Sequence, residues 1–326
     1  MDPRRTVVAS QPGVAAAAAE LPLTASAVDR VVAGVFAAVA LSPSVLFGPV
    51  QILLGGGGLG TFAIDGRVLQ PGKGAPRPRG FTADDAIPDA AWVAVPTLPG
   101  ALSAALALVR TTTLGRVAGP AIELAKERSA GRAKLLKLLG RRGGASFTDR
   151  ELVDELTNAF GRTAGGLLTA EDLAEPDIQA SPATITTLPG TKGSLARVPW
   201  FEPREPSADS VVHVVACGDT RGRFVVACYE DARDGVALES LDLVIPRLAE
   251  PVRRGEVRVR PGAARLASAP IALALAEGTA LAAAGRAGRD ADDGLESVAK
   301  SVVASEWTGA TGVVGVVRSR EGAAPL

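Results

Sequence analysis

The stretch Leu53–Val68, LLGGGGLGTFAIDGRV, contains the spacing G-x-G-x-x-G at Gly55, Gly57 and Gly60. A dinucleotide-binding turn with this spacing must open a helix, because the helix N-terminus supplies the N–H groups that hold the pyrophosphate. Here the glycines lead into TFAIDGRVL, a strand-like run with an Asp65-Gly66 turn signal, and no Gly-Lys-Ser/Thr follows. This context predicts a hairpin at Asp65-Gly66, with the glycine run as a kink beside a sheet. We therefore expect no nucleotide cofactor at this stretch.

The composition is that of an ordinary globular chain with a sizeable core. The 326 residues are 47% hydrophobic and 21% charged, and the formal net charge is zero. A neutral chain has no overall field that would attract nucleic acid or an anionic membrane, so neither is an expected partner. Aromatic residues make up only 4% of the chain, so small side chains and close backbone approach must fill the interior.

The chain has two cysteines, Cys217 and Cys228, and one histidine, His213. A structural zinc cluster needs four thiolate or imidazole ligands, so we expect no metal site. A single disulfide between the two cysteines is possible but not implied. His213 lies in the β-branched run VVHVVAC, which favours a position on a strand face over a role as a catalytic base.

The segment Val31–Ile64 carries no charge, but it does not predict a membrane span. Its apolar run is interrupted by Ser42-Pro43-Ser44 and Pro49, whereas a span needs about 20 consecutive apolar residues. We expect a buried core helix followed by buried loop. The N-terminal segment has a Ser-Gln-Pro-Gly interior that makes a poor signal peptide, so we expect a mature chain that starts near Met1 in the cytoplasm.

Capping and periodicity predict helices mainly in the first half of the chain. Capping-box patterns precede three of the expected helices, at Ser26-x-x-Asp29, Thr148-x-x-Glu151 and Thr169-x-x-Asp172. Further helices are expected over 101–109, from Pro120 onward, over the basic, leucine-bearing stretch 126–142, and over 294–305. For 126–142 we favour a solvated basic face over an apolar stripe rather than a surface that binds nucleic acid or membrane.

Strand signals dominate the second half. The runs 209–218 and 224–231 predict a hairpin, and strands are expected at 257–260 (VRVR), 267–275 and 312–319. The Pro-, Thr- and Gly-rich composition of the stretch 180–206 predicts a linker or surface loop. Helices followed by strands favour an α+β class over alternating βαβ units.

Six motifs together resemble one family. In chain order they are SAVDRVVAGVFAAVAL (26–41), GGGGLGTFAIDGR (55–67), PAIELAKE (120–127), GGLLTAEDLAEPD (165–177), RPGAARLASAPIALALAEG (260–278) and GVVGVVRSREGAA (312–324). They resemble landmarks of the gamma-glutamyltranspeptidases. The resemblance implies a single domain over 1–326, built as a four-layer αββα sandwich of the N-terminal nucleophile hydrolase type. It also implies a large-subunit-like half (1–206) and a small-subunit-like half (207–326). In this family self-cleavage exposes a threonine whose own amine acts as general base.

The residues that this chemistry requires are missing at several places. Where the family has Thr-Thr-His, this chain has Val211, Val212 and His213, and Ser210 stands one residue early. The supporting threonine on the next strand is replaced by Glu230. A valine can neither cleave the chain nor attack an amide, so the resemblance implies a chain that stays uncleaved.

Three further family features are altered. Gly72 stands where the family has an arginine for the substrate carboxylate, and the paired serines are reduced to Ala267-Ser268. In the oxyanion loop Gly288 is kept, but Arg289 replaces the second glycine, where close approach favours no side chain.

The sequence therefore predicts a gamma-glutamyltranspeptidase-like protein that has lost catalysis. It would act by binding an unidentified small ligand or a protein partner, such as a second copy or an active paralogue. The alternative is an altered amide hydrolase with Ser210 as nucleophile after cleavage before it, assisted by Ser268 and the Gly288 region. Cys217 is a weaker candidate nucleophile because it lies in mid-strand. A third hypothesis, that the protein binds a cofactor or nucleic acid, is supported only by the glycine run and the basic helix.

Overall fold

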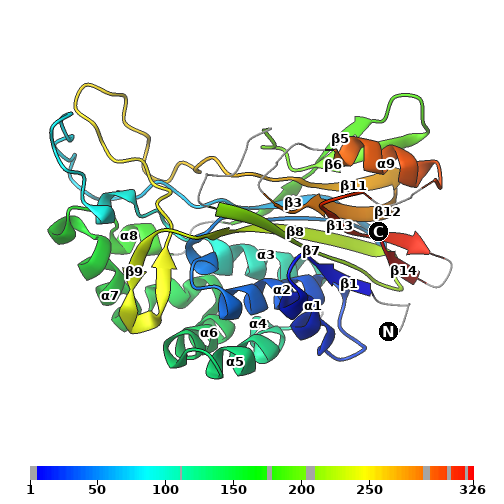
Figure 1. The fold of residues 1–326 in the computed structure, drawn as a ribbon, viewed down its shortest axis with the longest axis horizontal. Helices are drawn as coiled ribbons and strands as arrows, with labels where there is room; N and C mark the ends of the chain where they lie inside the picture. The colour runs from blue at the N-terminus through cyan, green and yellow to red at the C-terminus, as the bar shows by residue number, and fades with distance from the viewer. Residues whose placement is uncertain are drawn as a thin grey trace.

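The computed structural model describes residues 6–110, 112–174, 178–202, 210–288, 294–306, 310–319 and 322–326. In these ranges two six-stranded sheets lie against each other, with most helices on one side (Figure 1). The first sheet has the order β1 (Thr6–Ala9), β7 (Ser210–Gly218), β8 (Arg223–Ala232), β2 (Val50–Gly56), β3 (Leu59–Gly66) and β4 (Ala180–Pro182). The second has the order β14 (Gly322–Pro325), β13 (Val313–Ser319), β12 (Thr279–Arg286), β11 (Ile271–Ala276), β6 (Gly193–Arg197) and β5 (Thr184–Thr187). A separate pair is formed by β9 (Val236–Leu238) and β10 (Leu243–Ile245).

The helices are unequally divided between the outer faces of the sheets. Below the first sheet in Figure 1 lie α1 (Pro12–Ala19), α2 (Ala27–Leu41), α3 (Leu98–Val109), α4 (Leu114–Val117), α5 (Gly119–Lys126) and α6 (Ala130–Arg142). At the left of the view lie α7 (Arg150–Phe160) and α8 (Ala170–Leu173). On the second sheet lies α9 (Leu295–Val303). Short 3-10 turns connect them: η1 (Val45–Phe47), η2 (Asp89–Trp92), η3 (Gly143–Thr148), η4 (Arg162–Ala164) and η5 (Glu239–Leu241).

Alternation along β7 and β8 divides the core into two main layers. Val212 and Val214 join side chains of the second sheet, such as Ile271 and Leu273, in an apolar cluster between the sheets. The next residue, Val215, joins the larger cluster with residues of α2 and α3. Residues that alternate along a strand point to opposite faces, so one hairpin supplies side chains to both layers. The predicted hairpin of 209–218 and 224–231 is confirmed for the described part, from Ser210 onward.

Helix α2 is the central helix of the larger cluster. Ser26 caps it as predicted, because its hydroxyl accepts from the Asp29 N–H at 3.2 Å and its own N–H donates to the Asp29 carboxylate at 2.7 Å. Residues 27–40 are all buried, which confirms the expected core helix. Among the described residues, no helix is long and apolar enough to cross a membrane.

The glycine run forms the hairpin turn itself. Strands β2 and β3 pair directly, and Gly56, Gly57 and Gly58 between their paired ends have φ values of +85°, +63° and +81°. These left-handed conformations favour glycine. The predicted turn at Asp65-Gly66 is wrong, because both residues pair within the end of β3.

Three other local predictions are wrong. The stretch 180–206 contains β4, β5 and β6, whose short strands exist through pairing with β3 and β11. Residues 257–260 form no strand, because Val257 and Arg260 are exposed and the segment pairs with no strand among the described residues. The residue that precedes α7 as its N-cap is Asp149, one place after the predicted Thr148.

The basic segment 126–142 follows the favoured interpretation. In α6, Leu135, Leu136 and Leu139 are buried, whereas Lys134 and Lys137 are exposed. The leucines face the helical core, and the lysines face solvent.

Candidate functional site

Ser210 is the first residue of β7, at the end of the strand where the resemblance places the catalytic centre. It lies on the same side of the strand as Val212, facing the second sheet, and is 3% exposed. Its hydroxyl donates to Oε2 of Glu230 at 3.2 Å, and the Ser268 N–H donates to Oε1 of Glu230 at 3.3 Å. The structure therefore brings Ser210 and Ser268 together at the buried carboxylate of Glu230.

The cavity beside Ser210 is small. Its volume is about 100 Å³, and it is lined by Gly48, Pro49, Ser210, Glu230, Ala232, Asp234, Pro246, Arg247 and Leu248. Sites for small organic ligands usually measure about 300–1,000 Å³. The cationic side chain in the lining, Arg247, forms ion pairs with Asp89 at 3.0 Å and Asp234 at 2.6 Å. The cavity thus has room for water, and its arginine is already engaged.

The two valines of the degenerate motif do not line this cavity. Val211 pairs with Asp231 and faces the helix side of the sheet. Val212 is 1% exposed in the core between the sheets. Val211 therefore points away from the Ser210 hydroxyl, and Val212, opposite Glu230 in the sheet register, is packed in the core.

Gly288 is hydrogen-bonded to β7 rather than turned toward an open site. Its N–H donates to the Val212 carbonyl at 2.9 Å, and the Val212 N–H donates back to the Gly288 carbonyl at 3.2 Å. An oxyanion needs donors that point at the reacting oxygen, and this N–H points at a backbone carbonyl. Arg289, the other predicted position in this loop, lies outside the described residues.

Gly72 lies in a different surrounding from the Ser210 cavity. Its φ is +115°, and its N–H donates to the Asp172 carboxylate at 2.7 Å. A Cβ on this glycine would lie 2.7 Å from Nη2 of Arg258, so that guanidinium fills the space where a side chain would begin. The same Asp172 completes the predicted capping box with Thr169. Sequence reasoning did not identify Arg258, because it is distant from Gly72 along the chain.

His213 forms part of a polar network with the N-terminal segment. Its Nδ1 lies 3.1 Å from the Ser10 hydroxyl, its Nε2 lies 3.1 Å from the Gln11 amide nitrogen, and its ring stacks obliquely on Tyr229. The Tyr229 hydroxyl donates to the Gln11 amide oxygen at 3.0 Å. Burial lowers the pKa of His213 by disfavouring the charged ring, and Asp231 opposes this in part. The predicted position on a strand face is confirmed.

Both cysteines are buried thiols, and the disulfide left open by the sequence is not formed. Cys217 faces the helices and Cys228 faces the second sheet, on opposite faces of the hairpin. Burial raises the pKa of the Cys228 thiol, and the neighbouring Glu230 carboxylate adds to the effect. Within the described ranges, no three His, Cys, Asp or Glu side chains gather as a metal site would require.

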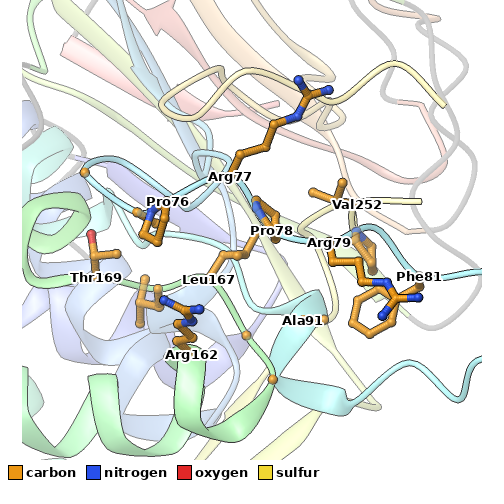
Figure 2. A pocket seen from close by; sticks show the side chains of 16 residues that line it. Pro76, Arg77, Pro78, Arg79, Phe81, Ala91, Arg162, Leu167, Thr169 and Val252 are labelled. Carbon is orange, nitrogen blue, oxygen red and sulfur yellow. The ribbon is translucent and has the colours of Figure 1, made fainter. Parts of the chain in front are cut away.

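A larger cavity, of about 410 Å³, lies among the loops around Pro76–Arg79, Leu167 and Val252 (Figure 2). In the sequence its first loop, residues 71–79 (PGKGAPRPR), is recognisable only as a Pro/Gly/basic segment. That composition is the feature of the sequence that could have indicated the cavity, because prolines and arginines also recur in its lining.

No family model matches this chain, and no curated protein sequence matches it significantly. Among solved structures, a cephalosporin acylase from Bacillus halodurans aligns with a TM-score of 0.72 and 15% identity, over 94% of this chain and 81% of that one. The structure described as LmbA2991T421A aligns with a TM-score of 0.64 and 14% identity, over 99% and 96% of the two chains.

These two matches span nearly the whole chain at low identity, so they show a shared fold and nothing finer. A gamma-glutamyltranspeptidase from Pseudomonas nitroreducens complexed with L-DON aligns with a TM-score of only 0.46 and 19% identity, over 59% and 70% of the two chains, which is too partial to add to the argument. The mixed helix-and-sheet architecture thus agrees with the class that the six motifs predicted: the chain has the fold of the N-terminal nucleophile hydrolases.

Proposed function

We propose that this protein keeps an N-terminal nucleophile hydrolase fold without the amide chemistry and acts by binding a ligand or a protein partner. The observation that carries the proposal is the cavity of about 100 Å³ beside Ser210, smaller than the usual range for an organic ligand. A substrate that cannot enter cannot be cleaved there.

The surrounding contacts support the same conclusion. Arg247 is paired with two carboxylates, and the Gly288 N–H is bonded to the Val212 carbonyl. Neither is therefore poised for a substrate carboxylate or an oxyanion. The positions that match the family's threonines hold Val211 and Val212, which carry no nucleophile.

The layered contacts allow two finer proposals about architecture. Helix α9 packs on the outer face of the second sheet and the other helices on the outer face of the first, which supports a four-layer αββα arrangement. We also infer that residues 1–326 form one domain, in which the large-subunit-like half (1–206) and the small-subunit-like half (207–326) stay covalently joined.

A second candidate function rests on one specific observation. Ser210 opens β7, and its hydroxyl is 3.2 Å from the Glu230 carboxylate; both residues line the small cavity. Cleavage before Ser210 would place a new α-amine beside that hydroxyl, as this type of catalysis requires. The candidate is an altered amide hydrolase with Ser210 as nucleophile.

The mass of the purified protein separates the two functions. We expect fresh and aged wild-type protein to remain one chain of 33.0 kDa. Ser210→Ala and the matched control Ser297→Ala, which changes an exposed serine of α9, should also remain one chain. If wild type and Ser297→Ala split into 1–209 and 210–326 while Ser210→Ala stays whole, the hydrolase candidate replaces the proposal.

A further inference from the structure

The cavity of about 410 Å³ is lined by Ala91 and by three segments that are far apart in the chain (Figure 2). They are residues 74–81, residues 162–169, and the pair Pro251-Val252. Backbone hydrogen bonds fix the third segment to the first: the Phe81 N–H donates to the Val252 carbonyl and the Arg254 N–H donates to the Phe81 carbonyl, both at 2.8 Å. The Thr169 hydroxyl fixes the second to the first by donating to the Lys73 carbonyl at 2.9 Å. The cavity is therefore built by ordered contacts and has the size of an organic-ligand site.

Its walls are largely apolar and stiff. Pro76, Pro78 and Pro251 contribute rings with fixed backbone angles, and Phe81 and Leu167 add larger apolar surfaces. Such a lining accepts the hydrocarbon part of a ligand with little loss of side-chain entropy, because proline rings have few conformations to lose.

The charged side chains of the lining are all arginines: Arg77, Arg79 and Arg162. Neither Arg77 nor Arg162 forms an ion pair within the part of the chain that the structure describes. In Figure 2 they stand on opposite sides of Leu167 and Pro78. The nearby carboxylate of Glu171 lies beside Gly74, at the edge of this lining. A neutral chain thus places three cations around one apolar cavity.

We propose that this cavity binds a small organic anion with an apolar body and a carboxylate or phosphate head group. The body packs on the proline rings, Phe81 and Leu167, and the head group pairs with Arg162, because a guanidinium group binds either anion through paired N–H donors. Arg77, on the other side of Leu167 and Pro78, adds positive charge without sharing the head group. The inference deepens the proposed binding function and names its ligand class.

The test is a fluorescence titration with anilinonaphthalene sulfonate, an aromatic anion, beside the uncharged phenylnaphthylamine. We expect one saturable site for the anion, whose affinity falls about tenfold in Arg162→Ala, falls less in Arg77→Ala, and falls when the salt concentration is raised. The matched control is Arg150→Ala, whose side chain is 95% exposed on α7 and outside this lining. The control should bind like wild type.

Competition then identifies the head group. Decanoate and decyl phosphate should both displace the probe, and the stronger competitor indicates the preferred anion, whereas decanol should not compete. Equal binding of the uncharged probe, absence of saturable binding, or unchanged affinity in Arg162→Ala would overturn the proposal. Circular dichroism of each variant checks the fold. Self-cleavage before Ser210 would refute the proposed non-catalytic function but would leave anion binding at this cavity unaffected. The failure of the proposed function and the failure of this inference therefore give different results.

Discussion

The glycine hairpin gives a graded prediction, because its glycines are required for different reasons. Gly60 has an ordinary φ, and an added Cβ would meet only the Phe62 ring at 3.2 Å, so Gly60→Ala should change the free energy of unfolding by at most about 0.5 kcal/mol. Gly58 has φ +81°, and an added Cβ would meet no atom within 4 Å. Gly58→Ala should therefore lower the free energy of unfolding by about 1 kcal/mol, because the strain of the left-handed backbone is partly offset by the lower entropy of the unfolded chain. Gly56 has φ +85°, and its Cβ would lie 2.2 Å from the Gly222 carbonyl oxygen. Gly56→Ala should therefore cost about 3 kcal/mol, because backbone strain and a backbone clash add.

Urea unfolding followed by tryptophan fluorescence measures these differences through the midpoint at constant m. Gly60→Ala is the matched control, since it makes the same chemical change in the same hairpin. Equal losses in the Gly56 and Gly58 variants would refute the clash with Gly222. A loss in Gly60→Ala as large as that in Gly56→Ala would refute the assignment of the turn.

Three shorter predictions test the interior. Arg30 is 4% exposed and donates to the Ala18 carbonyl at 3.0 Å and to the carbonyls of Leu21 and Pro22. Arg30→Met should therefore lower the free energy of unfolding in urea by about 3 kcal/mol, because these carbonyls lose their donor. A loss as small as that of the exposed control Arg150→Met would contradict this. The folded pKa of His213 is lowered, so the unfolded state binds more protons as the pH falls below about 6.5, and stability should decline there. His213→Asn should lose that part of the pH dependence, and an unchanged slope would show that another group causes it. Cys217 and Cys228 are buried, so a thiol reagent should label neither in the native protein and both in denaturant; fast native labelling would contradict their burial.

The sequence alone predicted the elements whose pattern is local. Alternation along β7 and β8, and the capping boxes at Ser26 and Thr169, are set by neighbouring residues, and each was found as predicted. The expected strand at 257–260 had the same alternation but no partner strand, and Val257 is 94% exposed. Conversely β5 is an exposed run of threonines and Ile185 that becomes a strand only because β6 lies beside it.

The candidate sites depended far more on tertiary structure. The sequence identified Ser210 as a hydroxyl near a degenerate motif and Glu230 as a replaced threonine, but only folding places their side chains 3.2 Å apart beside a cavity too small for an organic ligand. The sequence also showed a proline- and arginine-rich loop at 71–79 without indicating what encloses it. Residues 162–169 and 251–252 complete that cavity from distant parts of the chain. Periodicity and capping act over a few residues, so they determine strands and helices, whereas a cavity depends on which distant loops the packed sheets bring together.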